Sequence, residues 1–294
     1  HIVNKAKSLH SDHLLSFIIQ TVVKKSSTTE KTASYSIRKG GMPVNPVLIY
    51  HKGTTAACAQ AAAVLSDAGL KLVDHPTPEV THLLLDVPSF ASDGALRGGG
   101  TIREVLERLP PRVTVIGGKL SHPDLQGHPV IDLLDDEKYL AQNAAITAHC
   151  ALTIAASALE ITFRDTPALI LGWGRIGKCL AEQLKSLGCP PTVAARNPRD
   201  RAMLEALGLA AVDFSEIHGI LPGIRLLINT VPQPVLGGTI LDRCPECVKL
   251  DLASSPGLQG TGIIYARGLP GRYVPVSSGR LIAETILKTL KEAA

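Results

Sequence analysis

Residues 168–184 read ALILGWGRIGKCLAEQL, and this stretch decides the fold. Four apolar residues come first, with the length and composition of a strand that is buried on both faces. Three glycines then fall within six residues, at Gly172, Gly174 and Gly177, and a helical pattern follows. A strand, Gly-x-Gly-x-x-Gly and a helix in that order are typical of the turn that binds a dinucleotide. We therefore predict a Rossmann domain built around this turn.

Each glycine of the turn has a physical reason. The first allows a tight turn, the second lets the backbone approach a pyrophosphate, and the third packs the helix onto the strand. The helix start presents free N–H groups to the anion. A purely structural glycine turn is the alternative, but the flanking strand and helix favour nucleotide binding. The predicted cofactor-binding residues here are Gly172, Trp173, Gly174, Arg175, Ile176 and Gly177.

The next apolar run, TVAAR at 192–196, indicates which dinucleotide binds. An NAD enzyme places Asp or Glu near the end of this strand to bind the ribose hydroxyls. This chain has Ala195 and Arg196 there, followed by Asn197 and Arg199. Guanidinium groups bind a phosphate, whereas a carboxylate would repel it. We predict NADP rather than NAD, with a solvated basic loop as the alternative.

Two later apolar runs end in polar residues. LLINTVP at 226–232 places Thr230, Val231 and Pro232 where a strand end meets the nicotinamide side of the cofactor. VKLDLASSPG at 248–257 ends in Asp251 and two serines beside a turn. Because ligands bind at the carboxyl ends of such strands, both segments are candidate site regions.

The order of apolar runs and helical patterns divides the chain. Strands that alternate with helices predict parallel sheets. The expected parts are an extension at 1–41, an α/β substrate domain at 42–135, a linker helix at 136–165, a Rossmann domain at 166–276 and a final helix at 277–294. The extension is interpreted as disordered or non-native, with Met42 as the true start and a weak amphipathic anchor as the alternative.

Composition excludes several classes of protein. The chain has 294 residues, 45% of them hydrophobic and 19% charged, which is enough to build large cores. The formal net charge of +4 arises in the extension, where seven Lys or Arg face two acidic residues, so we expect neither nucleic-acid nor membrane binding by the folded part. Six cysteines without a disulfide spacing fit a reducing cytoplasm. Cys244 and Cys247 form one isolated CxxC, which is weak evidence for metal or redox chemistry, and we predict no metal.

Taken together, the motifs resemble the dipicolinate synthase A-subunit family. The resemblance extends over roughly residues 47–287 and is carried by these segments: GWGRIG (172–177), AAR (194–196), INTVP (228–232), DLASSPG (251–257) and GLPG (268–271). It implies a fold like that of D-2-hydroxyacid dehydrogenases, a Rossmann domain with a smaller flavodoxin-like α/β domain. It also implies NADP-dependent oxidation of a dihydro- or hydroxytetrahydrodipicolinate to dipicolinate, a product of spore-forming bacteria. A flavoprotein partner, the B-subunit of the synthase, is implied as well, and we expect a homo-oligomer.

Two segments depart from the family pattern. His149-Cys150 stands where the family usually has Glu-Gly, and Leu258-Gln259-Gly260 stands where a second glycine followed by Thr-Asp is expected. Both segments are expected near the substrate. The identity of the substrate is therefore less securely predicted than the fold.

The implied reaction removes a hydride and a proton, so the protein must orient a dicarboxylate and accept the proton. His149 is a candidate base because its ordinary pKa suits proton transfer near neutrality, and packing is the alternative role. Asp251 is a candidate either as base or as orienting residue. The predicted substrate-binding residues are Lys119, Thr147, Ser254, Ser255, Arg267 and Gly268, and for each arginine a surface charge is the alternative.

Two other functions stay open. One is a different NADP oxidoreductase, resembling shikimate dehydrogenase through the Arg-Asn and Thr-Val-Pro elements. The other is a nucleotide-binding regulatory subunit without catalysis, which the lack of an unmistakable catalytic pair favours.

Overall fold

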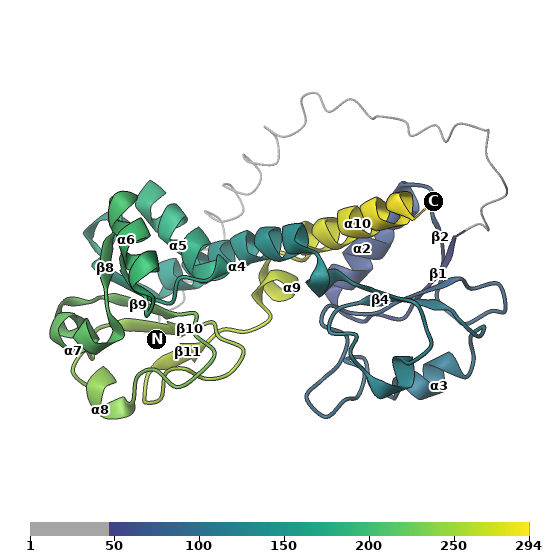
Figure 1. Ribbon diagram of the computed structural model, residues 1–294, viewed down its shortest axis with the longest axis horizontal. Helices are drawn as coiled ribbons and strands as arrows, with labels where there is room; N and C mark the ends of the chain where they lie inside the picture. Colours follow the sequence, from purple (N-terminus) through teal and green to yellow (C-terminus); the bar gives the residue numbers. More distant parts are fainter. Residues whose placement is uncertain (1–46, 294) are drawn as a thin grey trace, which may run out of the picture. The chain divides into compact units, whose positions relative to one another are not determined.

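The computed structural model describes residues 47–293 and has an α/β architecture with two parallel β-sheets (Figure 1). The extension at 1–41 and the start at Met42 that the sequence predicts lie outside the described residues. Among residues 47–293, no helix combines the length and the apolar character that crossing a membrane requires.

The first sheet has five parallel strands in the order β2-β1-β3-β4-β5. This order is that of flavodoxin-like folds, so the predicted class of the smaller domain is confirmed. The strands are β1 (Leu48–His51), β2 (Lys71–Val73), β3 (His82–Leu84), β4 (Thr114–Gly117) and β5 (Val130–Asp132).

The second sheet has six parallel strands in the order β11-β10-β9-β6-β7-β8. Numbered along the chain and read from β8, this is the order 3-2-1-4-5-6 of a Rossmann fold, so the predicted dinucleotide-binding architecture is confirmed. The strands are β6 (Ala168–Leu171), β7 (Thr192–Ala194), β8 (Ala210–Val212), β9 (Leu226–Asn229), β10 (Val248–Asp251) and β11 (Ile263–Tyr265).

Helices connect the strands along the chain, and two more helices come after the last strand of the second sheet. The α-helices are α2 (Ala56–Asp67), α3 (Ile102–Leu106), α4 (Glu137–Ala158), α5 (Arg175–Ser186), α6 (Pro198–Ala206), α7 (Ile217–Ile220), α8 (Gly238–Leu241), α9 (Leu269–Tyr273) and α10 (Pro275–Glu292). Short 3-10 turns lie at Pro123–Leu125, Leu133–Asp135, Phe163–Asp165, Phe214–Glu216 and Leu221–Gly223.

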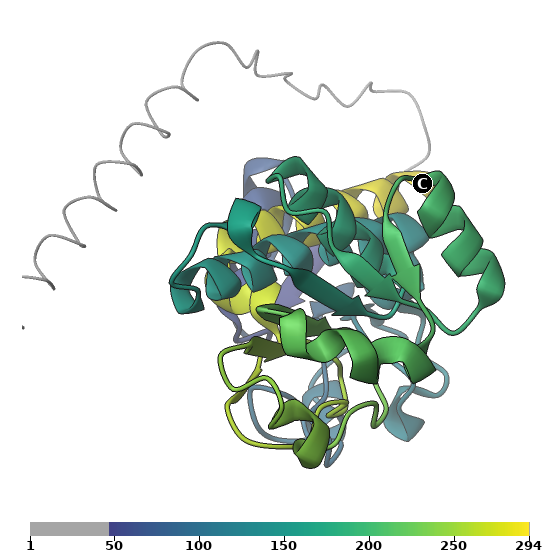
Figure 2. The same cartoon turned by 90° about the vertical axis from the view of Figure 1, so that its left-hand side faces the viewer.

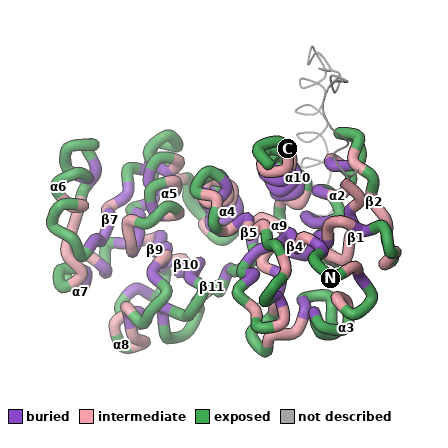
Figure 3. The backbone as a smooth tube through the Cα atoms, turned by 45° about the vertical axis from the view of Figure 1, so that its right-hand side comes forward, coloured by how far each residue is buried: buried purple, intermediate pink, exposed green. Residues whose placement is uncertain are grey.

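Helix α10 completes the core of the first sheet. One face of that sheet packs on α2 and α10, through residues such as Ile49, Leu65 and Ile286, and the other face is covered by α3 and loops. The two helices lie side by side in Figure 1 and their facing sides are buried in Figure 3. The contact is close at Gly279, where an added Cβ would lie 2.6 Å from the Ala57 carbonyl oxygen. The first core is therefore built from distant parts of the sequence.

The second sheet is covered on both faces (Figure 2). Helices α4, α5 and α6 pack on one face, and α7 and α8 pack on the other. Its central strands β6 and β9 are buried at every residue because helices cover both sides, which explains their unbroken apolar sequences. All these strands run parallel, so their carboxyl ends form one edge, where the glycine turn lies.

Several elements differ from the sequence prediction. Residues 198–206 form helix α6, which was not predicted; Asn197 caps this helix and Pro198 occupies its first turn. The linker helix ends at Ala158 rather than at 165, and the final helix begins at Pro275 rather than at 277. Strands β8 and β11, which have three residues each and form the two edges of the second sheet, were not predicted.

Candidate functional site

The glycine turn has the geometry that its sequence predicts. Gly172 has φ +101°, and an added Cβ there would lie 2.6 Å from the Thr230 hydroxyl oxygen. An added Cβ at Gly177 would collide with the Gly172 carbonyl oxygen, so helix and turn pack backbone to backbone. At Gly174, by contrast, a Cβ would meet no atom within 4 Å. The space above Gly174 is open, as the approach of a pyrophosphate requires.

The start of α5 offers its backbone N–H groups to a ligand. Gly174 is the N-cap residue, and no side chain among the described residues caps this helix end. The Arg175 guanidinium instead donates to both carboxylate oxygens of Glu137, at 2.6 and 2.7 Å. Its backbone belongs to the turn, but its side chain is bound to α4. The Arg175 side chain is therefore engaged by Glu137, and only its backbone is left for the cofactor-binding role that the sequence predicts.

The other two residues of the turn pack beneath it. Trp173 and Ile176 are half-buried against the core of the second sheet. The Lys178 ammonium lies 5.8 Å from the centroid of the Trp173 ring, which holds that ring by a cation–π contact. These contacts are those of supporting side chains, and the cofactor-binding role of Trp173 and Ile176 stays a prediction.

Thr230 and Val231 lie directly beside Gly172. The Thr230 hydroxyl donates to the Leu171 carbonyl at 2.8 Å, and its N–H donates to the same oxygen at 2.9 Å. Val231 is buried, whereas Pro232 is exposed. The structure brings together the two segments that the sequence assigned to the cofactor.

Arg196 lies at the end of β7, next to the glycine turn in sheet order. Ala195 before it is only 3% exposed and has no carboxylate to offer a ribose. Arg196 itself is exposed. When the Gln233 amide is oriented with its oxygen toward Arg196, both Nη atoms of Arg196 donate to that oxygen at 2.8 Å. Gln233 is neutral, and among residues 47–293 no carboxylate forms an ion pair with Arg196.

Of the two neighbours of Arg196 that the sequence assigned to the cofactor, Asn197 has a structural role. The Asn197 side chain accepts the N–H of Arg199 at 2.9 Å and thereby caps α6. The Arg199 side chain is exposed in the first turn of that helix. Arg201 donates to the Ala195 carbonyl and to Asp213, so it secures the end of β7. Of this basic segment, Arg196 and Arg199 have exposed side chains and form no ion pair with another described residue.

Asp251 is fully buried, with 0% exposure, and accepts four hydrogen bonds. Its carboxylate accepts from the Asn229 amide at 3.0 Å and from the backbone N–H groups of Ala253 (3.1 Å), Gly257 (2.7 Å) and Leu258 (2.9 Å). An ionised carboxylate has about four acceptor positions, and all are occupied. Of the two roles predicted for Asp251, the geometry favours the orienting role, because no lone pair is left for a substrate proton.

The 251–257 turn carries the exposed Ser254 and Ser255. The Arg267 Nε donates to the Ala253 carbonyl of this turn at 2.7 Å. Gly268, with φ +63°, follows directly as the N-cap residue of α9. These four predicted substrate-binding residues therefore lie at the carboxyl edge of β10 and β11.

The other predicted substrate and catalytic residues lie elsewhere. Lys119 follows β4 of the first sheet with φ +60°, and its N–H donates to Asp132 at 3.1 Å while its side chain is exposed. Thr147 is buried in α4 and donates to the Asn143 carbonyl at 2.8 Å. His149 lies on the exposed side of α4, whereas Cys150 is buried in the second core. No described side chain holds the His149 ring, so its role as a base stays a prediction.

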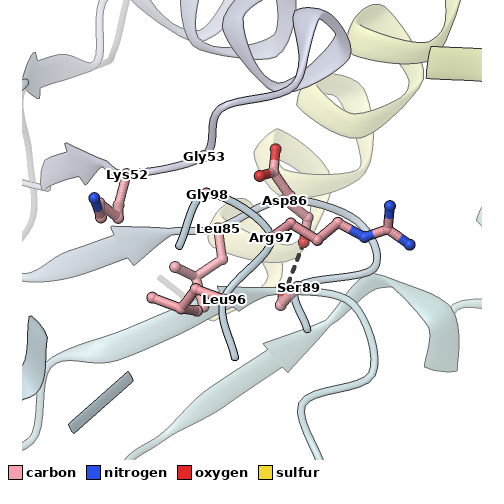
Figure 4. A pocket seen from close by; sticks show the side chains of 8 residues that line it. All are labelled: Lys52, Gly53, Leu85, Asp86, Ser89, Leu96, Arg97 and Gly98. Carbon is pink, nitrogen blue, oxygen red and sulfur yellow. Dashed lines mark hydrogen bonds between the residues drawn. The ribbon is translucent and has the colours of Figure 1, made fainter. Parts of the chain in front are cut away.

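A small hollow lies at the carboxyl end of the first sheet (Figure 4). Lys52 and Arg97 line it, but their charged ends extend to opposite sides (Figure 4). The buried Asp86 carboxylate accepts from the N–H and hydroxyl groups of Thr54 and Thr55, at 2.6 to 3.1 Å. This built-in anion occupies the start of α2, so that helix end is not available to a ligand.

Asp86 and its partners were not predicted from the sequence. The signal was present: Asp86 follows the apolar run of β3, and Thr54 and Thr55 follow β1, so parallel strands bring them to one edge. Nearby, burial lowers the pKa of His51, and Asp86 opposes that shift.

The isolated CxxC has the properties of core thiols. Cys244 and Cys247 are buried in the core of the second sheet. Burial, with Cys244 as the next cause, raises the pKa of the Cys247 thiol to about 12. Such a thiol is almost fully protonated at neutral pH and is a poor nucleophile.

The fold and the glycine turn define a two-domain protein with a Rossmann dinucleotide-binding unit. No protein-family model matches the sequence. The chain is similar to the dipicolinate synthase A-subunit of Bacillus subtilis (strain 168), with 26% identity over 238 residues, which are 74% of this chain and 80% of the relative. The resemblance inferred from the motifs is thereby confirmed.

Solved structures support the fold. The dipicolinate synthase A-subunit from Bacillus halodurans superposes with a TM-score of 0.71 at 21% identity, covering 83% of this chain and 98% of that chain. An NAD-binding D-isomer specific 2-hydroxyacid dehydrogenase from Polaromonas sp. superposes with a TM-score of 0.52 at 13% identity, covering 84% and 98%. The predicted likeness to the D-2-hydroxyacid dehydrogenase fold is confirmed.

Proposed function

We propose that this chain is a nicotinamide-dependent oxidoreductase that acts as the A-subunit of a dipicolinate synthase. Its reaction is the NADP-dependent oxidation of a dihydro- or hydroxytetrahydrodipicolinate to dipicolinate. The observation that carries this proposal is the glycine turn at 172–177, which is tightly packed at Gly172 and Gly177 and open at Gly174. The similarity to the Bacillus subtilis protein supplies the substrate.

The residues present fit a dinucleotide. The open backbone at Gly174 and the uncapped start of α5 would hold the pyrophosphate, and Thr230 and Val231 would flank the nicotinamide half. The exposed Arg196 would hold the 2′-phosphate of NADP. When bound, the nicotinamide ring accepts a hydride, and the protein supplies orientation and a path for the proton.

Asp251 acts as a positioning residue in this proposal. By accepting three backbone N–H groups it fixes the turn that carries Ser254 and Ser255 at the end of β10. A turn held in this way keeps its exposed groups in place before substrate arrives, which lowers the entropic cost of orientation. His149 stays the predicted proton acceptor.

We further propose a flavoprotein partner equivalent to the B-subunit, because the relative is itself named as one subunit of a synthase. Turnover is therefore expected to need the partner, and a homo-oligomer of this chain remains part of the proposal. A cytoplasmic location is proposed from the six cysteines, all of which are free.

A second function is favoured by one observation. Asp251 has no free acceptor position, and no described side chain orients His149, so the described residues contain no recognisable catalytic pair. A regulatory subunit that binds nucleotide without turnover would have these features. It predicts tight NADP(H) binding and no product with or without a partner.

Titration of NADP and NAD into the purified chain tests the cofactor assignment. Losing charge-assisted hydrogen bonds of roughly 1.5–3 kcal/mol should make Arg196→Ala bind NADP about 10- to 150-fold more weakly. NAD lacks the phosphate, so its affinity should change little. Arg243→Ala, which removes an exposed charge elsewhere in the same domain, is the matched control. Parallel loss of both affinities in Arg196→Ala would contradict the assignment.

The reaction is tested by measuring NADPH and dipicolinate formation with the chain alone and with the flavoprotein partner added. We expect product only with both proteins present. Product from the chain alone would overturn the need for a partner. Tight nucleotide binding without product in either mixture would favour the regulatory function.

A further inference from the structure

The guanidinium of Arg267 contacts two neutral groups, and within residues 47–293 no carboxylate pairs with it. Its Nε donates to the Ala253 carbonyl at 2.7 Å, and its central carbon lies 5.6 Å from the centroid of the Tyr265 ring. The Tyr265 hydroxyl donates in turn to the Leu258 carbonyl at 3.0 Å, which fixes the ring. Arg267 is thus secured from two sides by neutral groups.

The two terminal nitrogens of Arg267 remain available. Among the described residues no carboxylate forms an ion pair with Arg267, and its one hydrogen bond uses Nε. An ordinary surface arginine is mobile and loses side-chain entropy when it binds a partner. Here the contacts to Ala253 and Tyr265 have already ordered the side chain. The exposed Nη1 and Nη2 form a planar fork whose shape matches a carboxylate.

The position of Arg267 places this fork on the nicotinamide side of the sheet. Sheet order is β11-β10-β9-β6, and Arg267 follows β11 by two residues while the glycine turn follows β6. In a Rossmann fold the two halves of the sheet bind the two halves of the dinucleotide. The half formed by β9, β10 and β11 therefore lies on the nicotinamide side, where a substrate must be for hydride transfer.

The turn to which Arg267 is attached is equally rigid. Ala253, its acceptor, donates its own N–H to the buried Asp251. The exposed Ser254 and Ser255 follow directly in the same turn. A cation and two hydroxyl groups are thus presented on one preorganised loop, which is the set of donors that a small carboxylate ligand requires.

We propose that Arg267 binds a carboxylate of the substrate through its two terminal nitrogens and so selects a small organic acid. This assignment rests on the proposed function, because it takes the substrate to lie beside a bound nicotinamide. It makes Arg267 a specificity-determining residue. The carboxylate is held at the β10–β11 edge, with the serines of the 251–257 turn as neighbouring donors.

The test is calorimetric titration of the NADP-saturated full chain with three probes: pyridine-2,6-dicarboxylate, pyridine-2-carboxylate and the neutral pyridine-2,6-dicarboxamide. Arg267→Gln should weaken binding of both carboxylates by about 10- to 100-fold and leave the affinity for NADP within about twofold. Arg267→Lys should restore only part of the affinity, because an ammonium lacks the fork. Arg243→Gln, which removes the same charge at an exposed position elsewhere, should bind as the wild type does.

The outcomes separate this assignment from the proposed function. A wild-type chain that binds no dinucleotide would refute the proposed function itself. If the wild type binds NADP and the dicarboxylate, but Arg267→Gln weakens carboxylate binding by less than about threefold, only the assignment of Arg267 fails. Binding of NADP without any carboxylate, or equal binding of the neutral diamide, would also overturn it.

Discussion

Replacing Asp251 by asparagine should cost the protein much of its stability. The Asp251 carboxylate is fully buried and accepts two hydrogen bonds on each oxygen: Asn229 and Ala253 on one, Gly257 and Leu258 on the other. Asparagine keeps one acceptor oxygen and replaces the other by an N–H₂ group. In either orientation of the amide, two buried donors then face a donor.

The magnitude follows from the number of bonds lost. A hydrogen bond to a charged group contributes about 1.5–3 kcal/mol, so losing two should cost about 3–6 kcal/mol. A typical domain is stable by about 5–15 kcal/mol, so the variant should still fold in the cold but unfold at much lower denaturant concentration. Because the loss is local to the 251–258 turn, its serines should also become disordered.

Urea unfolding at pH 7 measures this cost as a shift of the midpoint at unchanged slope. Asp242→Asn, which changes an exposed aspartate of the same domain, is the control and should stay within about 0.5 kcal/mol of the wild type. If Asp251 were instead the catalytic base, Asp251→Asn would keep wild-type stability and lose only turnover. A measured cost below about 1 kcal/mol would therefore refute the structural role.

Two further predictions concern the helices. Asp136 caps α4 by accepting the Tyr139 N–H at 2.8 Å, and it pairs with Lys288 at 3.2 Å. The hydrogen bond from Tyr139 is the largest cause, and the contact with Lys288 a further cause, that lowers the pKa of the Asp136 carboxyl. Asp136→Ala should lower the free energy of unfolding by about 0.5–2 kcal/mol near neutral pH. A lowered pKa stabilises the fold only while the carboxyl is ionised. Urea titrations at a series of pH values should therefore show the stability difference between wild type and variant shrinking below the ordinary pKa of 3.8. Gly279→Ala should destabilise by about 1–3 kcal/mol although alanine favours helices, because its Cβ would lie 2.5 Å from the Gln60 Cβ. Gly219→Ala is the control, because an added Cβ there would meet no atom within 4 Å, and it should be neutral or stabilising. Equal melting temperatures for Gly279→Ala and Gly219→Ala would refute the close contact between α2 and α10.

The glycine turn was predictable because its signal is local. A buried strand, three spaced glycines and a helix occupy one continuous stretch, and the close packing of Gly177 on Gly172 needs no distant contact. The parallel arrangement of both sheets followed from the alternation of strands and helices and from the family resemblance. Local chemistry thus gave both the class of fold and the cofactor edge.

What could not be predicted depends on contacts between distant residues. The periodicity of α10 showed an apolar face but not that α2 would cover it. Asp251 was visible in the sequence as the end of a strand, whereas its role depends on N–H groups of a turn that only the fold brings to it. His149 lies two residues after the buried Thr147, and a helix places such neighbours on different faces. Helix α6 was missed although Asn197-Pro198 is a recognisable start signal.

The pairing of α2 with α10 also has a consequence for synthesis of the chain. The second sheet lies in the sequence between Asp67, where α2 ends, and Pro275, where α10 begins. At roughly 5–20 residues per second, a ribosome needs about 10–40 s to make that interval. Throughout this time the apolar side of α2 has no permanent cover, while the Rossmann unit can already fold as it emerges. The domain encoded first is therefore the one that must finish folding last, and its nascent form is a natural client for chaperones.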